Sequence, residues 1–570
     1  MPFLPVDKAE IKAPLDIILV SGDAYIDHPS FGPALIGRYL EAQGFSVGII
    51  PQPNWKTDHD FLKLGRPRLF FGVSAGNLDS MVANYTADKK IRRNDMYSPS
   101  NEAGRRPDRA TIVYTNKLKA LFPGVPIVIG GVEASLRRLA HYDYWSNKVR
   151  RSLLFDAKAD YLVYGMGEKG ILAIAQNKMP APNSAIITKD ISRYKEALVL
   201  PSFEEISSDK KKYAEAFKLF YLEGRKRHPR VIIQPCQGRY LVVFPPQNLV
   251  PQELDRLFEL PFMRAPHPRY RQTPIPAWGF VKFSTVSHRG CFGGCSFCAI
   301  SQHHGKYVVS RSLGSIKKEL KEKIIPQPDF KGYILDVGGP TANMYGITCS
   351  KEAGCTRASC LDPEVCKSLN VSQKPSLKLL KELRQLPGIK KVFIGSGIRY
   401  DLALLDQEYL SELVKHHVSG QLSVAPEHIC EEVLLLMGKP QANKFLEFRD
   451  KFKKLNKQHG KKQFLVPYFI AAHPGSTLEH ALELALFMKK NKIRVEQVQN
   501  FTPAPMTAAT CMYYTGRDPF SGQAVHVPRG EERSWQKALL QPYLSKNYRL
   551  VAKALRRLGK LNLLKHLTAV

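Results

Sequence analysis

The sequence predicts an α/β protein with two units in tandem, a doubly wound parallel sheet in residues 1–176 and a partial (β/α)6 barrel in residues 276–530. Three observations support this prediction. Short apolar runs alternate with helical patterns in both parts, which is typical of parallel sheets. An irregular stretch at 177–275 interrupts the alternation. Beyond it, six strand–helix units follow in succession, which is enough for an incomplete barrel.

The elements of the first unit follow from its apolar runs. Strands are expected at 16–21, 46–50, 68–74, 126–131 and 161–165, and helices at 33–43 and 109–122. Gly44 follows the first helix directly and is a typical C-terminal stop, because glycine accepts the left-handed backbone found there. Helices that alternate with parallel strands cover both faces of a sheet.

The stretch at 177–275 is expected to connect the two units without a core of its own. It holds one charged helical piece, 208–227, and a proline-studded run, VVFPPQNLVPQELDRLFELPFMRAPHPRY. Prolines at this density interrupt regular elements, since each removes a backbone N–H donor. We therefore expect this connecting region to wrap between the units.

The second unit contains six expected strands and the helices between them. The strands are expected at 279–286, 332–339, 390–397, 420–426, 463–471 and 495–503. The helices are expected around Ile316, Leu320 and Ile324 and at 375–385, 405–416, 430–437, 441–456 and 477–490. A cysteine-rich insert, 345–370, leaves the second strand. The last part, 531–570, is predicted to be a basic helical extension whose apolar positions pack on the barrel.

Charge and composition limit the classes of partner. Lysine and arginine outnumber aspartate and glutamate by 84 to 51, a net charge of +33, so the chain attracts polyanions, with RNA the first candidate. A generally basic surface without a nucleic-acid role stays open. The beginning of the chain lacks the apolar core of a secretory signal, and no run approaches the roughly 18 apolar residues of a membrane span. We expect a cytoplasmic protein with reduced cysteines and no membrane partner.

Three cysteines carry the clearest chemical signal. In SHRGCFGGCSFCAI, Cys291, Cys295 and Cys298 have C-x3-C-x2-C spacing in a glycine-rich loop between a strand and a helix. A cubane cluster normally takes one thiolate per iron, so three cysteines leave one iron open to a small molecule. The alternatives are a chance group of thiols or structural zinc, with His303 or His304 as fourth ligand. We predict the cluster with one open iron.

This motif resembles the signature of radical S-adenosylmethionine (SAM) enzymes, with Phe297 at the aromatic position before the last cysteine. The next segment, AISQHHGKYVVSRSLGSIKKEL, resembles that of radical SAM methylthiotransferases and their relatives. Closer still is the resemblance to YgiQ-like radical SAM proteins. It rests on GDAYIDHPSFG, FFGVSAGNLDSM, RRPDRATIVYTNKLK, GGVEASLRRLAHYDYWS, GGPTANMYG, SVAPEH and QNFTPAPMTAATCMYYT, and it covers nearly the whole chain.

The resemblance implies a 4Fe-4S cluster on the three cysteines, with the amino and carboxylate groups of SAM on the fourth iron. It implies that an external one-electron reductant of flavodoxin or ferredoxin type drives cleavage of SAM, and that the 5′-deoxyadenosyl radical abstracts hydrogen from a substrate, with RNA a candidate. Residues that would bind SAM are Phe297 and the strand-end residues Gly338, Gly339, Pro340, Thr341, Ser396, Arg399 and Glu427, and His473 ends the fifth strand. The usual acidic residue after the paired glycines is absent. A non-catalytic Fe–S or zinc protein that binds RNA is the alternative function.

A second group of cysteines lies in the insert. Cys349, Cys355, Cys360 and Cys366 fall within eighteen residues, with spacings of five, four and five residues. Four thiols this close in a reducing compartment predict a metal site, either tetrahedral zinc or a second Fe–S cluster. The spacings match neither the zinc-knuckle nor the ferredoxin pattern. Unliganded, redox-sensitive thiols are the alternative.

The first unit is similar to the Rossmann-like, cobalamin-binding domains of some radical SAM enzymes. Residues 165–170, GMGEKG, formally fit the dinucleotide pattern, but they follow the last strand and not the first, so they more closely resemble a turn of cobalamin domains. The usual D-x-H-x-x-G is missing, because Asp27 and His28 are adjacent and Gly32 follows four residues later. A histidine ligand to cobalt, and with it cobalamin as cofactor, is therefore doubtful. Cobalamin bound without protein ligation, a retained scaffold and a substrate lid remain open.

Overall fold

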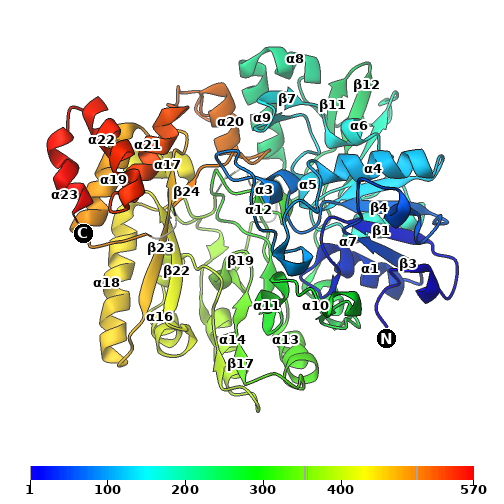
Figure 1. Cartoon of the computed structure of the whole chain (residues 1–570), viewed down its shortest axis with the longest axis horizontal. Coiled ribbons are helices and arrows are strands. Elements are labelled where there is room, and N and C mark those ends of the chain that lie inside the picture. The colour runs from blue at the N-terminus through cyan, green and yellow to red at the C-terminus, as the bar shows by residue number, and fades with distance from the viewer. Residues whose placement is uncertain (1, 352–354, 356, 358, 496–497, 570) are drawn as a thin grey trace.

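The computed structural model describes residues 2–351, 355, 357, 359–495 and 498–569. It contains a large mixed sheet near the N-terminus, a partial barrel in the middle of the chain, and helices that lie against the far side of the barrel (Figure 1). The predicted fold class is confirmed.

Five parallel strands form the centre of the first sheet, in the order β3-β1-β4-β5-β8. They are β1 (Ile17–Ser21), β3 (Val47–Pro51), β4 (Phe70–Ser74), β5 (Ile127–Gly130) and β8 (Tyr161–Val163). Each lies within or beside an apolar run identified from the sequence. In such an order the chain turns back between β1 and β4, where ligands typically bind at the carboxyl ends of the strands.

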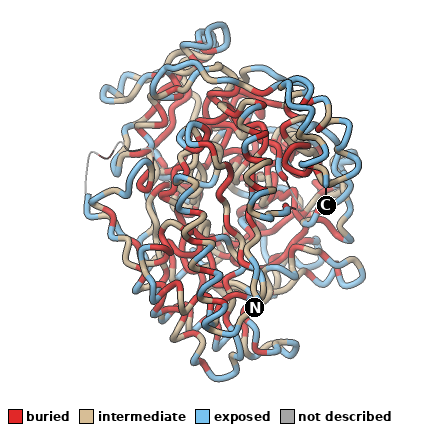
Figure 2. Tube along the Cα trace, turned by 90° about the vertical axis from the view of Figure 1, so that its left-hand side faces the viewer, coloured by how far each residue is buried: buried red, intermediate tan, exposed pale blue. Residues whose placement is uncertain are grey.

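Helices cover both faces of this sheet, because successive side chains of each strand point to opposite faces. Ile18 and Val20 of β1 pack with α4 (Ala110–Leu121) and α6 (Leu153–Ala157). Ile17 and Leu19 pack on the other side, with α1 (Gly32–Ala42) and α7 (Glu168–Ala175). The two buried layers confirm the doubly wound arrangement, and Figure 2 shows how buried segments run through the interior.

The stretch expected only to connect the units also extends the sheet, which differs from the prediction. Its strands continue beyond β8 in the order β9-β12-β11-β10. They are β9 (Ser184–Thr188), β10 (Leu198–Val199), β11 (Ile232–Cys236) and β12 (Arg239–Val243). The reason is that Ile233 and Val242 bury an apolar face that the proline-rich composition had obscured. Helices α8 (Phe203–Ser208), α9 (Lys210–Glu223) and α10 (Pro251–Glu259) complete this region.

Six parallel strand segments, one of them made of two short strands, form the barrel. Its strands are β14 (Ser284–Val286), β17 (Tyr333–Ile334) with β18 (Asp336–Gly338), β21 (Lys391–Val392), β22 (Gln421–Glu427), β23 (Phe464–Ala471) and β24 (Gln499–Asn500). Parallel pairs and one bridge between Ile398 and Val424 link neighbours in chain order. Residues 496 and 497 of the expected last strand lie outside the described residues.

The first expected barrel strand, 279–286, is wrong in its first half. Residues Ala277–Val281 form helix α11, and only Ser284–Val286 are extended. Trp278 and Val281 of this helix pack against the core of the first unit, so contacts between the units override the local apolar pattern.

The barrel helices agree with the predicted periodicity. They are α13 (Leu313–Glu319) with a π-helical end at Leu320–Ile324, α14 (Lys374–Arg384), α16 (Gln407–Glu412), α17 (Glu431–Met437), α18 (Ala442–Gln458) and α19 (Leu478–Lys490). Ile316, Leu320 and Ile324 are fully buried in the barrel core, as their spacing of four predicts.

The C-terminal extension packs on the barrel. It contains α21 (Glu531–Leu540), α22 (Tyr548–Arg557) and α23 (Leu564–Thr568), and α20 (Ala508–Thr515) precedes it. Val551 and Leu555 are fully buried against Leu478 and Leu482 of α19, in agreement with the sequence (Figure 1). Among the described helices, none is both long and apolar enough to cross a membrane.

Candidate active site

The three-cysteine loop leaves the first barrel strand, β14, and leads into α12 (Ile300–His303). An antiparallel pair, β15 (His288–Arg289) with β16 (Val309–Ser310), closes its base. Gly290 has φ +89°, and a Cβ there would lie 2.0 Å from the carbonyl oxygen of Tyr307. Only glycine fits at this position, because any side chain meets both the left-handed backbone and a fixed carbonyl group.

The structure brings Cys291, Cys295 and Cys298 together on this loop. Burial, reinforced by the charge of Cys295, raises the pKa of the Cys298 thiol to about 12. Burial also raises the pKa of the Cys291 thiol, so both groups favour the neutral form unless a cation or a metal centre stabilises the thiolates. In the part of the chain that the structure describes, no three histidine, cysteine, aspartate or glutamate side chains converge on a point that one metal ion could occupy.

Two side chains at neighbouring strand ends contact these thiols. The Oγ1 atom of Thr341 lies 3.9 Å from the sulfur of Cys291. The guanidinium of Arg399 lies 3.7 Å from the sulfur of Cys295. Thr341 follows β18 and Arg399 follows the third strand position, so the carboxyl edge of the barrel surrounds the cysteine loop.

Arg399 is held by an aspartate that sequence reasoning missed. Its Nε and Nη2 atoms donate to Asp401 at 2.9 and 2.7 Å. Burial opposes ionisation of Asp401, but the charge of Arg399 outweighs it and holds the pKa of the carboxyl below its usual value. A bidentate pair fixes the plane of the guanidinium. The spacing Arg-x-Asp after a strand was the available signal.

Glu427 ends β22 in an unusual backbone conformation, with φ +68°. Its side chain is 8% exposed, and burial raises its pKa although the charges of Lys439 and Arg399 oppose the shift. Cys298 lies within electrostatic reach of this carboxyl. A non-glycine residue with positive φ at such a position is typical of functional sites.

The paired glycines after β18 allow close approach of neighbouring groups. A Cβ at Gly338 would lie 2.2 Å from the hydroxyl of Ser396, and a Cβ at Gly339 would lie 2.4 Å from the ring of His288. The backbone N–H of Ser396 donates to Asp336 at 3.1 Å, and its hydroxyl donates to the same carboxyl. The acidic residue that lies beside the paired glycines in this structure is therefore Asp336, which precedes them. Pro340, next in the chain, is partly exposed beside Thr341.

Phe297 and His473 tie the loop to the fifth strand. The two rings meet edge to face at 5.9 Å, and the His473 Nε2 atom lies 3.2 Å from the hydroxyl of Ser296. Burial lowers the pKa of His473 to about 4, so the ring is neutral near pH 7. In the structure both residues therefore support the loop from inside.

A cavity of about 580 Å³ lies between the two units, at the carboxyl ends of β1, β4, β5 and β8. Among the residues that line it are Gly76, Val132, Gly167, Arg289, Ile300 and His303. Across it, Arg289 of the cysteine loop donates to Glu168 of the GMGEKG run at 2.6 Å. The run thus contacts the barrel.

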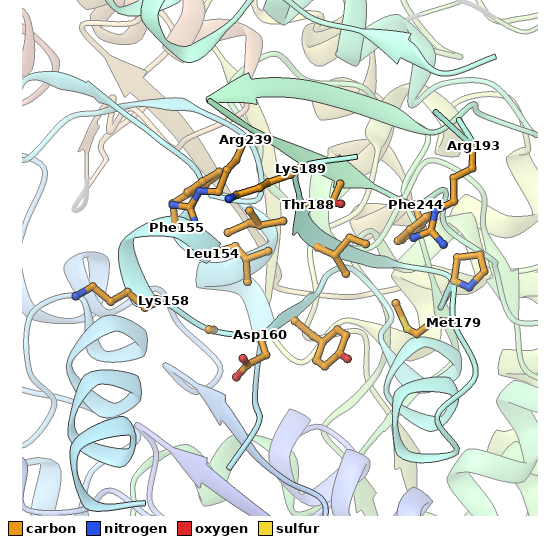
Figure 3. A pocket seen from close by; sticks show the side chains of 15 residues that line it. Leu154, Phe155, Lys158, Asp160, Met179, Thr188, Lys189, Arg193, Arg239 and Phe244 are labelled. Carbon is orange, nitrogen blue, oxygen red and sulfur yellow. The ribbon is translucent and has the colours of Figure 1, made fainter. Parts of the chain in front are cut away.

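A second cavity, of about 610 Å³, lies on the first unit between α6, β9 and β12. Figure 3 shows Lys189 and Arg239 near Phe155, and Arg193 near Phe244. These three cations and Lys158 are exposed, and none pairs with a carboxylate that the structure describes. Cationic and aromatic groups therefore share one open pocket.

Three of the four insert cysteines lie beside the cysteine loop. Cys360 and Cys349 pack, with Cys366 and Cys291, against the same apolar cluster around Phe292. The nearest members of the two cysteine groups, Cys298 and Cys349, are 51 positions apart in the sequence, and the fold brings the groups together.

Family models divide the chain into three parts. "Radical SAM N-terminal" matches residues 3–284, "Radical SAM superfamily" matches residues 285–488, and "Domain of unknown function (DUF3362)" matches residues 496–566. The second match contains the cysteine loop and most of the barrel.

The chain is similar over nearly its whole length to proteins of several microorganisms. It is 48% identical to a "UPF0313 protein" of Methanosarcina acetivorans, covering 98% of this chain and 81% of that one. A "UPF0313 protein" of Geobacter sulfurreducens is 49% identical, with 98% and 95% covered.

Among solved structures, the radical SAM methyltransferase TsrM of Kitasatospora setae, with cobalamin and a [4Fe-4S] cluster bound, has a TM-score of 0.50 and 16% identity, covering 88% of this chain and 79% of that one. At this identity the likeness concerns the fold alone. The family matches and the near-full-length relatives agree with the predicted YgiQ-like resemblance. The chain belongs to the UPF0313 family and is a radical SAM enzyme.

Proposed function

We propose that Cys291, Cys295 and Cys298 hold a 4Fe-4S cluster that binds SAM. The observation that carries this proposal is the placement of three thiols on one loop, shaped by Gly290, at the carboxyl edge of the barrel. The donor set fits, because three thiolates leave one iron of a cubane for SAM. When bound, the cluster supplies the electron that cleaves the sulfonium bond of SAM to methionine and a 5′-deoxyadenosyl radical.

The residues at the strand ends are proposed to bind and orient SAM. Gly338 and Gly339 lack side chains, so the backbone there can approach a ligand closely. Arg399, held by Asp401, is a cation beside the thiols, and Glu427 adds a buried carboxyl group whose pKa is raised by burial. Ser396, with its hydroxyl oriented by Asp336, is suited to a sugar hydroxyl. His473, neutral and buried, positions the loop through Ser296.

The cavity between the units is the proposed substrate site, since it opens beside the cysteine loop and is lined mainly by apolar groups. TsrM binds cobalamin, and we propose that this chain does not use a histidine ligand for one. His28 is 2% exposed, its Nδ1 accepts from the backbone N–H of Ser30 at 3.1 Å, and its ring packs on Trp278. This ring belongs to the core and not to the cavity lining.

The test is reductive SAM cleavage by the anaerobically reconstituted protein with dithionite or reduced flavodoxin, measured as 5′-deoxyadenosine. Wild type is expected to form it, and Cys298→Ala is expected to lose it because one iron lacks its thiolate. Cys236→Ala is the matched control, since this thiol is buried on β11 away from the loop. A full cluster without 5′-deoxyadenosine would contradict the proposal.

RNA is the proposed polyanion for the pocket in Figure 3, in addition to the enzyme activity. A positively charged groove with aromatic side chains suits single strands, whose bases stack and whose phosphates pair with cations. The family match does not favour a non-catalytic RNA-binding protein, so binding would serve substrate capture.

Salt-dependent binding of a single-stranded oligouridine tests this second property. Replacing Lys189, Arg193 and Arg239 by glutamine is expected to flatten the slope of log K against log salt by about 2, as three lost phosphate contacts predict. Glutamine at three exposed lysines of α18 is the control: Lys453, Lys454 and Lys457. Equal slopes in the two variants would refute a role of the pocket.

A further inference from the structure

The cysteine-rich insert folds back on itself and gathers four thiols. The strand β19 (Thr348–Cys349) pairs antiparallel with β20 (Leu369–Asn370), so the two ends of the insert are joined. Inside it, the backbone N–H of Cys366 donates to the carbonyl of Cys360 at 2.8 Å. The thiol of Cys360 lies within electrostatic reach of Cys349, Cys355 and Cys366. Cys360 therefore has the other three insert thiols in its surroundings, although their spacing in the sequence matches neither the zinc-knuckle nor the ferredoxin pattern.

The insert contacts the first cysteine loop directly. The backbone N–H of Cys360 donates to the carbonyl of Phe292 at 3.1 Å, and the hydroxyl of Ser359 donates to the carbonyl of Gly293 at 2.7 Å. Phe292 and Gly293 lie between Cys291 and Cys295, so these bonds reach the middle of the proposed SAM-cluster loop. Cys291 also shares an apolar cluster with Cys360. The two thiol groups are therefore neighbours in one packed region.

A buried lysine points into the insert. Lys306 is 6% exposed, and its Nζ lies 3.0 Å from the sulfur of Cys355 and 3.0 Å from the carbonyl of Arg357. A buried ammonium is costly unless it is paired, and no carboxylate that the structure describes forms an ion pair with it. The sulfur of Cys355 is the side-chain group that the structure places against this nitrogen. A site with several thiolates and one resident cation fits a metal–sulfur centre of net negative charge.

We infer that Cys349, Cys355, Cys360 and Cys366 hold a second iron–sulfur cluster, packed against the loop of the first. The thiolates of an iron–sulfur cluster bind separate irons. Their sulfur atoms therefore lie around the cluster and need not converge on the single point that zinc requires. Contact with a loop proposed to bind a redox centre favours iron and sulfide over zinc. All ten cysteines are free thiols, so the four are available as ligands.

The position of this cluster gives it a role in electron supply, which rests on the proposed function. A flavodoxin- or ferredoxin-type donor transfers one electron to the second cluster and so reduces it. The second cluster is oxidised again when it passes that electron to the first, so no further co-reactant is needed. Lys306 stabilises the reduced form, because a cation opposes the added negative charge.

The experiment measures iron, sulfide and zinc in the anaerobically purified full chain and in two variants. One variant replaces Cys291, Cys295 and Cys298 by alanine, and the other replaces Cys355 and Cys360. Wild type is expected to contain about eight irons and eight sulfides, and each variant about four, since each site holds one cubane. Electron paramagnetic resonance of the reduced proteins then identifies the cluster, because only the first site should change its signal when SAM is added.

The variant without Cys291, Cys295 and Cys298, called the triple variant below, decides the inference even if the Cys355/Cys360 variant fails to fold. Iron and sulfide that persist without the first three cysteines support the second cluster. A triple variant that contains no iron, or that contains zinc alone, overturns it. If wild type carries both clusters but SAM neither shifts a signal nor is cleaved, the proposed function fails while the second cluster stands. Electron transfer through the second cluster is refuted if the Cys355/Cys360 variant cleaves SAM at the wild-type rate with flavodoxin. It is supported if that rate is lost while cleavage driven by dithionite is retained.

Discussion

The ion pair between Glu168 and Arg289 joins the two units beside the cysteine loop, and its loss should be costly. The oxygen and nitrogen are 2.6 Å apart, and the side chains are 2% and 10% exposed. Changing Glu168→Gln keeps the shape and one acceptor but leaves the Arg289 guanidinium buried without a counter-charge. Breaking a buried pair on one side typically costs about 3–5 kcal/mol, and the retained acceptor favours the lower end.

Thermal unfolding of the anaerobic holoprotein measures this cost. For a domain of 150–250 residues, about 3 kcal/mol corresponds to a decrease in Tm of about 6–12 °C. Arg289 directly precedes Gly290, so formation of 5′-deoxyadenosine should fall as well. The control is Glu215→Gln, whose partner Lys212 is 3.0 Å away and whose pair is about half exposed, and which should cost less than about 1 kcal/mol.

A second change separates charge burial from lost packing. Combining Glu168→Gln with Arg289→Met removes both charges, so the double variant should be more stable than Glu168→Gln alone. The reasoning is refuted if Glu168→Gln unfolds at the same temperature as the Glu215→Gln control. It is equally refuted if Arg289→Met adds its full cost on top of the first substitution, because an uncompensated buried charge would then not be the cause.

Three further outcomes are expected. Burial disfavours the Glu319 carboxylate, but two buried arginines outweigh this and hold its pKa at about 2. The carboxylate therefore stabilises the folded protein above the usual pKa near 4.5, and this stabilisation is lost as pH falls toward 2. The difference in unfolding free energy between wild type and Glu319→Gln should shrink over that range. Gly290→Ala should lose bound iron, whereas Gly104→Ala, which has a similar positive φ but open space around it, should keep it. In the triple variant, Lys306→Met should lower the midpoint potential of the remaining cluster in a redox titration, and an unchanged potential would contradict the contact.

The alternation of strands and helices could be predicted because each buried parallel strand is a short apolar run with few competing interpretations. Where contacts between the two units decide the conformation, the local pattern of apolar residues did not predict the secondary structure. Trp278 and Val281 belong to a helix because they pack on the first unit, although their neighbours look like a strand. Similarly, Ile233 lies in a hairpin of β11 and β12 that joins the sheet through β9 (Ser184–Thr188), a contact that the local sequence does not indicate.

The candidate site shows the same limit at the level of side chains. The first three cysteines could be predicted as cluster ligands because loop chemistry is local and depends on their spacing, and their ligation stays a prediction. Lys306 was missed because its partner, Cys355, is 49 residues away, and nothing in the neighbouring sequence marks the lysine as buried. Asp401 was missed although it lies only two residues from Arg399, because an exposed aspartate has the same local pattern.

The cysteine loop is held from three directions by parts of the chain that are far apart. Glu168 reaches it from the first unit, Ser359 from the insert, and His473 from the fifth strand. Each contact uses a buried polar group, so each is stabilising only when the others exclude water from the region. The loop geometry is therefore set by docking of both units and cannot be a property of the barrel alone. Because an iron–sulfur cluster needs its thiolates at fixed corners, cluster binding and docking should favour each other thermodynamically, and a first unit that detaches would loosen the cluster it does not itself touch.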